Sequence, residues 1–145
     1  TPLQAKKPLN STSLMSFKEI AVGDYSFQGK EKPMRLKDLI ENPLISLGQG
    51  STTYEFYSKF FLENDLVLSP DTEVETIDQV LPLIMNGLGI GFLPELFVRP
   101  VIEEGKVCQI PLKENIPERE ICLVENHTFP PSIAADMFKK MLVLK

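Results

Sequence analysis

The chain has 145 residues, a formal net charge of −5 and an apolar share of 43%. This length allows one domain or two small lobes, and the composition is that of a folded soluble protein. The acidic balance, without a cluster of Lys and Arg, argues against a nucleic-acid-binding surface, and no run of about eighteen apolar residues is present to span a membrane.

The two cysteines, Cys108 and Cys122, lie in apolar stretches and lack the spacing of a metal site or a CxxC redox pair. We interpret both as reduced core thiols, which favours the cytoplasm. The first residues contain no hydrophobic signal region, and the chain begins without methionine, as a processed product or a fragment would.

The first third of the chain predicts a lead-in segment, two strands and a short helix. Residues 1–16 are polar and contain two prolines, which is typical of a segment without regular structure. Residues 17–27 partly alternate between apolar and polar side chains, as a half-buried strand does. A short helix over residues 36–40 and a buried strand over residues 44–47 follow.

A polar loop, residues 48–51, leads into a helix that we predict over residues 52–64. Thr52 and Glu55 have the spacing of a capping box, in which each side chain accepts from the other residue's backbone amide. Five aromatic residues follow within this helix, and we interpret them as core.

The stretch 73–94, EVETIDQVLPLIMNGLGIGFLP, is the most informative part of the chain. After a strand over residues 71–75, apolar residues recur at three- and four-residue steps and predict a helix over residues 76–86, with Thr76 as its N-cap. Pro82 lies inside this helix and predicts a bend or a late start, because proline has no backbone N–H to donate.

Three glycines end this helix and begin the next strand. Gly87 is expected in the left-handed conformation that closes helices, while Gly89 and Gly91 let another backbone or a ligand approach a strand over residues 90–93. A nucleotide-binding glycine loop is not expected, because such a loop follows a strand and opens a helix, and here the order is reversed.

The rest of the chain predicts a short helix over residues 95–104, strands over residues 107–112 and 118–125, and a last amphipathic helix from Pro131 onward. The alternation of strands and helices predicts an α/β fold with mainly parallel sheets and crossover helices.

No group of residues indicates catalysis. His127, the only histidine, lies in a polar loop and is interpreted as solvated. Glu73, Glu75 and Asp78 would point in different directions across the strand-to-helix junction, and Ser51 lacks a G-x-S-x-G context. We therefore predict no catalytic residue, no metal site and no cofactor.

A binding function is better supported. Ser51, Thr52 and Thr53 at one helix start and Thr76 at another each follow a predicted strand. In an open parallel sheet these loops lie at the carboxyl edge, where ligands bind, and amides at helix starts favour an anion or a carboxylate. Capping alone is the alternative explanation of Thr52 and Thr76, and both roles can hold together.

The segment ET-x-x-x-VLPLI-x-x-GLGIGFLP, residues 75–94, resembles the signature of the effector-binding domain of LysR-type transcriptional regulators. Residues 36–51, LKDLIENPLISLGQGS, resemble the family's segment that leads into the pocket loop. The resemblance covers the chain from about residue 17 onward. It implies a fold like type 2 periplasmic binding proteins, with two lobes and a small-molecule inducer in the cleft between them.

The resemblance also implies a truncated domain. About 28–117 would form lobe II, and about 1–27 with 118–145 would form an incomplete lobe I, with hinge strands near residues 20–26 and 121–125. The DNA-binding helix-turn-helix head lies outside this chain, so DNA would be contacted only through it. We expect a homodimer or tetramer, because the truncation would expose an apolar face.

Carried over residue by residue, the resemblance gives a candidate ligand site for a small, anionic effector. A Thr76→Ala exchange would weaken a carboxylate effector by about 1–3 kcal/mol if a buried ligand atom lost its partner. A solute-binding protein for transport and an enzyme of the same bilobal fold are the alternatives, and the enzyme would need an acid or base that we do not find. The candidate ligand-binding residues are Gln49, Gly50, Ser51, Thr52, Thr76 and Ile77.

Overall fold

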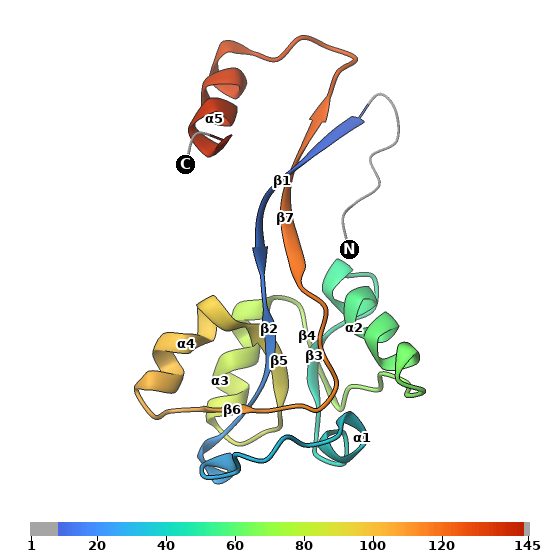
Figure 1. Cartoon of the computed structure of the whole chain (residues 1–145), viewed down its shortest axis with the longest axis vertical. Helices are drawn as coiled ribbons and strands as arrows, with labels where there is room; N and C mark the ends of the chain where they lie inside the picture. Colours follow the sequence, from blue (N-terminus) through green and yellow to red (C-terminus); the bar gives the residue numbers. More distant parts are fainter. Residues whose placement is uncertain (1–8, 144–145) are drawn as a thin grey trace. The chain divides into compact units, whose positions relative to one another are not determined.

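The computed structural model describes residues 9–143, which divide into two compact units (Figure 1). One unit is Lys18–Pro117, and the other contains the described residues 9–17 and 118–143. Residues 1–8, the first half of the predicted lead-in segment, and residues 144–145 lie outside the described residues.

The larger unit is built on five short strands. Strand β2 pairs antiparallel with β5 on one edge and with β6 on the other, while β3 pairs with β4 in parallel. A parallel bridge between Leu44 and Ile90 joins the β3 side to β5. The strands are β2 (Glu19–Gly23), β3 (Ile45–Leu47), β4 (Thr72–Val74), β5 (Gly91–Pro94) and β6 (Cys108–Ile110).

The prediction of mainly parallel sheets is wrong, since three of the four ladders among the described strands are antiparallel. Two of these involve β2, whose five residues are all buried. The physical reason is that a buried strand is recognised by its apolar side chains, whereas its direction depends on distant partners. The α/β class and the β3–α2–β4 crossover are as predicted.

Helices cover both faces of these strands, with α2 on one side and α3 and α4 on the other (Figure 1). The side chains of β2 alternate accordingly, because Ala21 belongs to one apolar core and Ile20 and Val22 to a second. The helices of this unit are η1 (Tyr25–Phe27), α1 (Leu36–Leu39), α2 (Thr52–Glu63), η2 (Ile77–Gln79), α3 (Val80–Met85) and α4 (Glu95–Glu103).

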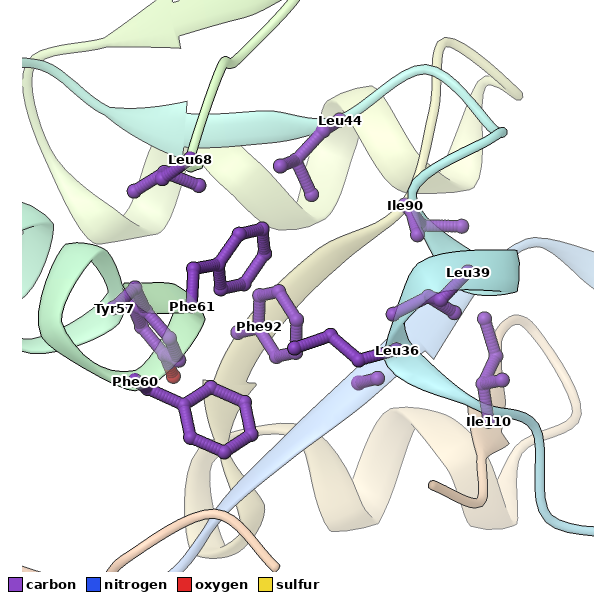
Figure 2. Close-up of a cluster of buried hydrophobic side chains, with 11 residues drawn as sticks. Leu36, Leu39, Leu44, Tyr57, Phe60, Phe61, Leu68, Ile90, Phe92 and Ile110 are labelled. Atoms are coloured by element: carbon purple, nitrogen blue, oxygen red, sulfur yellow. The ribbon is translucent and has the colours of Figure 1, made fainter. Parts of the chain in front are cut away.

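The first core is aromatic and lies between α2 and the strands (Figure 2). The rings of Tyr57 and Phe92 stack with centroids 4.7 Å apart, and Phe61 meets Phe92 edge-on at 6.1 Å. Tyr57, Phe60 and Phe61 are all buried. The prediction that the aromatic residues of this helix form core is therefore confirmed.

The cap of α2 differs from the prediction by one residue. Ser51, not Thr52, is the N-cap, and its Oγ accepts a hydrogen bond from the Tyr54 backbone N–H at 3.0 Å. Ser51 has the extended backbone that an N-cap requires, whereas Thr52 is already helical. A capping serine of this kind contributes about 1 kcal/mol, and sequence spacing alone cannot choose between neighbouring hydroxyl residues.

The helix before the glycines starts late, as predicted from Pro82. A single 3-10 turn, η2, precedes α3, so Pro82 falls in the first turn of α3, where backbone N–H groups have no helical partner. Gly87 has a φ of 74° and donates to the Ile84 carbonyl, and Leu88 donates to Leu83. This is the predicted glycine-terminated helix end.

Gly89 shows why a glycine is needed at the start of β5. A β-carbon there would lie 2.6 Å from the carbonyl oxygen of Pro43. That carbonyl accepts from the Ile90 N–H at 2.9 Å, and Ile45 donates to the Ile90 carbonyl at 2.8 Å. The close approach predicted at this glycine is thus made by another backbone segment.

The smaller unit contains an antiparallel ribbon of β1 (Leu9–Phe17) and β7 (Arg119–Asn126) and the helix α5 (Ile133–Val143). The prediction of an unstructured lead-in is wrong for residues 9–16, which form β1. Most side chains of this ribbon are at least partly exposed, so β1 lacks the apolar alternation by which strands are recognised. Residues 121–125 pair with β1, and residues 20–26, the other predicted hinge segment, contain most of β2 and part of η1.

Helix α5 has no buried residue among those described. Its apolar stripe is open to solvent, with Ile133 83%, Met137 61% and Met141 68% exposed. Over the described part of the chain, no helix has the length and apolarity that crossing a membrane would require.

Candidate functional site

A pocket of about 370 Å³ lies in the larger unit, at the carboxyl ends of β3 and β4. The loop after β3 contributes one wall, and the end of β4 contributes the other. This is the edge of a parallel strand pair at which α/β proteins bind ligands. The lining residues are Gly48, Gln49, Ser51, Glu73, Val74 and Glu75.

The register of β3 and β4 brings these two walls together. Ser46 lies opposite Glu73 and Leu47 opposite Val74, so the segments that follow the two strands leave the sheet side by side. Ser51 Oγ closes the first loop, because it donates to the Gly48 carbonyl at 3.0 Å while it caps α2. The pocket wall is thus held by the same hydroxyl that starts the helix.

Two of the four candidate residues of the first loop line this pocket. Gln49 and Ser51 line the pocket, and Gly50 lies between them with a φ of +93°, a conformation that other residues rarely adopt. Thr52 is the first residue of α2 and does not belong to the lining.

The candidate residues of the second helix start are not brought to this pocket. Thr76 is the N-cap of η2, and Ile77 is partly buried against the second core. The Oε1 atom of Gln79 accepts from the backbone amides of Glu75 at 2.9 Å and Thr76 at 3.1 Å. The side chain of Gln79 thus folds back on the segment that leads into η2, as in a capping box.

Glu73 and Glu75 are the lining residues that sequence reasoning missed. We expected them to point in different directions, but both line the same pocket. Residues two apart on a strand project from the same face, and Glu73 lies in β4 with Glu75 directly after it. The predicted strand over residues 71–75 already contained both residues, and its period of two could have placed them on one face.

The smaller unit has a pocket of its own. A second pocket, of about 500 Å³, lies between β7 and α5 and contains the Lys139–Glu125 ion pair at 2.9 Å. His127 lines it and is exposed, as predicted for a loop histidine. Within residues 9–143, no group of three or more His, Cys, Asp or Glu side chains is arranged to hold a metal ion.

Both cysteines are free, as predicted. They are half-buried, whereas a core position would bury them fully. Burial, and secondarily the carboxylate of Asp24, raise the pKa of the Cys108 thiol above its usual value. A raised pKa lowers the thiolate fraction at neutral pH, which is the opposite of what a nucleophilic cysteine needs.

A model of the LysR substrate binding domain matches residues 7–143 of the chain. The chain belongs to this family. The LysR substrate-binding domain is a ligand-binding module, which agrees with the prediction of a binding protein without catalysis.

Two curated relatives of this LysR domain are transcription regulators. The chain is 28% identical over 100 residues to the HTH-type transcriptional regulator YwqM of Bacillus subtilis, and the match covers 69% of this chain and 33% of the relative. It is 34% identical over 64 residues to the HTH-type transcriptional activator CmpR of Synechocystis, covering 44% of this chain and 21% of the relative. The chain thus spans a third or less of the length of these relatives.

Solved structures with the same fold include two that hold small molecules. The effector binding domain of QuiR in complex with shikimate has a TM-score of 0.82 and 17% identity, covering 98% of this LysR domain and 67% of that chain. The regulatory domain of Synechocystis CcmR in complex with 2-PG has a TM-score of 0.83 and 14% identity, and the match covers 99% of this chain and 69% of that chain. These matches confirm the fold of the LysR regulatory domain.

Proposed function

We propose that this domain is the sensory part of a LysR-type transcriptional regulator and binds its small-molecule effector in the pocket at the ends of β3 and β4. The observation that carries the proposal is the convergence of two loops on one pocket, which places Gln49 and Ser51 beside the end of β4. The two regulators among the curated relatives and the small molecules bound by QuiR and CcmR support it.

We further propose that the effector carries an anionic group that binds at the start of α2. This helix has twelve residues, and its first backbone N–H groups carry partial positive charge beside the pocket. Ser51 is well placed for this role because it is both the cap of α2 and a lining residue.

The two units provide the basis for the lobes. We propose that the unit Lys18–Pro117 is lobe II and that residues 9–17 with 118–143 belong to a partial lobe I. The boundary then lies near residue 17 rather than 27, because β2 pairs with β5 and β6 of the larger unit. DNA binding would reside in a head outside this chain, and a cytoplasmic location goes with the proposal because a regulator acts where the DNA is.

A panel of small carboxylic acids that includes shikimate tests the site. The panel is titrated into the isotope-labelled chain while backbone amide shifts are followed by NMR. We expect at least one member to shift the amides of residues 48–51 and 73–75. Gln49→Ala should weaken the binding of that acid about two- to tenfold, the size of one lost hydrogen bond of about 0.5–1.5 kcal/mol.

Gln28→Ala is the matched control, because Gln28 is also an exposed glutamine and does not line the pocket. It should leave the affinity unchanged. The proposed site would be contradicted if the shifts mapped to other surfaces, or if no member of the panel shifted these amides.

The exposed stripe of α5 leads us to propose self-association of the chain. Ile133, Met137 and Met141 follow one another at four-residue steps and are mostly exposed. Sedimentation velocity should show a dimer that dissociates on dilution, and Met137→Glu should shift the equilibrium toward the monomer. A monomer at the highest soluble concentration would contradict this expectation.

A further inference from the structure

We infer that Glu73 and Glu75 set the charge preference of the pocket, so that the effector presents hydrogen-bond donors, such as an ammonium group, opposite its anionic end. The inference rests on the proposed function, since it concerns the ligand class of the same pocket. It predicts zwitterionic or donor-rich ligands and disfavours ligands with an anionic group at both ends.

The carboxylate of Glu73 lies close to Gly48 in the first loop. A β-carbon at Gly48 would lie 3.2 Å from Glu73 Oε2, so the carboxylate occupies the space that a side chain there would need. Glu73 lies in β4 opposite Ser46 of β3, which fixes its backbone. The sheet therefore fixes the point from which the Glu73 side chain extends.

The pocket supplies no positive side chain to balance these two charges. Its lining contains Glu73 and Glu75 but neither lysine nor arginine. Neither carboxylate forms an ion pair with another of the described residues. Elsewhere, exposed lysines do form ion pairs, as Lys59 does with Glu63. A ligand group that reaches this wall therefore meets net negative charge.

Two parts of the pocket lining differ in what they attract. The start of α2 behind Ser51 favours an anion, because of the partial charges on its first amides. The wall of Glu73 and Glu75 accepts hydrogen bonds only, because ionised carboxylates have no proton to donate. An ammonium group there gains charge-assisted hydrogen bonds, and a second carboxylate meets repulsion at short range.

A matched pair of ligands tests the inference. We take 4-aminobutyrate and glutarate, two probes that share a carboxylate and a three-carbon spacer and differ in the second end group, ammonium against carboxylate. Both are titrated into the labelled chain at the same pH and ionic strength, and the amides of residues 48–51 and 73–75 are followed by NMR. We expect 4-aminobutyrate to bind at least tenfold more tightly than glutarate.

Glu73→Gln keeps the size of the side chain and removes its charge. This variant should reduce the preference for 4-aminobutyrate at least threefold. Glu31→Gln removes one charge from an exposed loop outside the pocket and should leave the preference unchanged. Because Glu73 is exposed, both variants are expected to fold, which far-UV circular dichroism checks.

The outcomes separate the inference from the function on which it rests. If glutarate shifts the same amides with equal or higher affinity, or Glu73→Gln leaves the preference intact, the charge rule is overturned while ligand binding at the pocket stands. If neither probe, nor any acid of the panel, shifts these amides, the pocket is not an effector site and the inference falls with it.

Discussion

Replacing Phe61 by alanine should lower the free energy of unfolding by about 3–5 kcal/mol. Phe61 is fully buried in the aromatic core between α2 and the strands, where its ring meets Phe92 edge-on and lies 6.2 Å from Phe60 (Figure 2). Removing the ring leaves a cavity that surrounding side chains fill only in part, so dispersion contacts are lost in addition to apolar burial.

Leu62→Ala is the matched control for this prediction. Leu62 is the next residue of the same helix and is 60% exposed, so its replacement should change the free energy of unfolding by about 0.5 kcal/mol or less. Urea unfolding of the three proteins measures the difference as a shift in midpoint at constant slope. Equal losses for the two variants would mean that the core does not lie where the structure has it.

The exchange Gly89→Ala should cost about 2–4 kcal/mol. The added methyl group would lie 2.6 Å from the Pro43 carbonyl oxygen, which is backbone and cannot move aside as a flexible side chain can. The same carbonyl accepts the hydrogen bond from Ile90, beside the bridge that joins Leu44 to Ile90. The substitution therefore pushes apart the backbone segments that connect β3 and β5.

Gly105→Ala is the control for the steric clash between the methyl group added at Gly89 and Pro43, because it measures the cost of a glycine-type backbone conformation without a clash. Gly105 has a φ of +77° and open space around its α-carbon, so an alanine there is strained only by its backbone and should cost about 1 kcal/mol. Both variants are compared by urea unfolding. A loss at Gly89 no greater than that at Gly105 would show that the sheet adapts to the methyl group.

The proposed ligand site illustrates how far local patterns reach. The polar loop after β3 was identified from its position between a strand and a helix, and Gln49 and Ser51 do line the pocket. Thr76 was identified by the same rule but does not line the pocket. Which helix start faces a pocket depends on how the strands and loops around it are arranged, and spacing does not report this.

Features determined by neighbouring residues were readable from the sequence by itself. The helix that starts late before Pro82 and ends at Gly87 involves only interactions within one segment, as do the aromatic face of α2 and the family signature. Each depends on helical periodicity or on the conformational freedom of glycine, which are properties of a few consecutive residues.

The tertiary structure alone decided strand direction and the chemistry of the pocket. The antiparallel pairing of β2, the ribbon of β1 with β7, and the meeting of Glu73 and Glu75 with Gln49 join segments that are far apart in the chain. Pairing and register are fixed by the packing of whole sheets rather than by the residues within one strand. The sequence therefore determined the family and the local elements, while the charge around the proposed ligand pocket was set by which strands lie side by side.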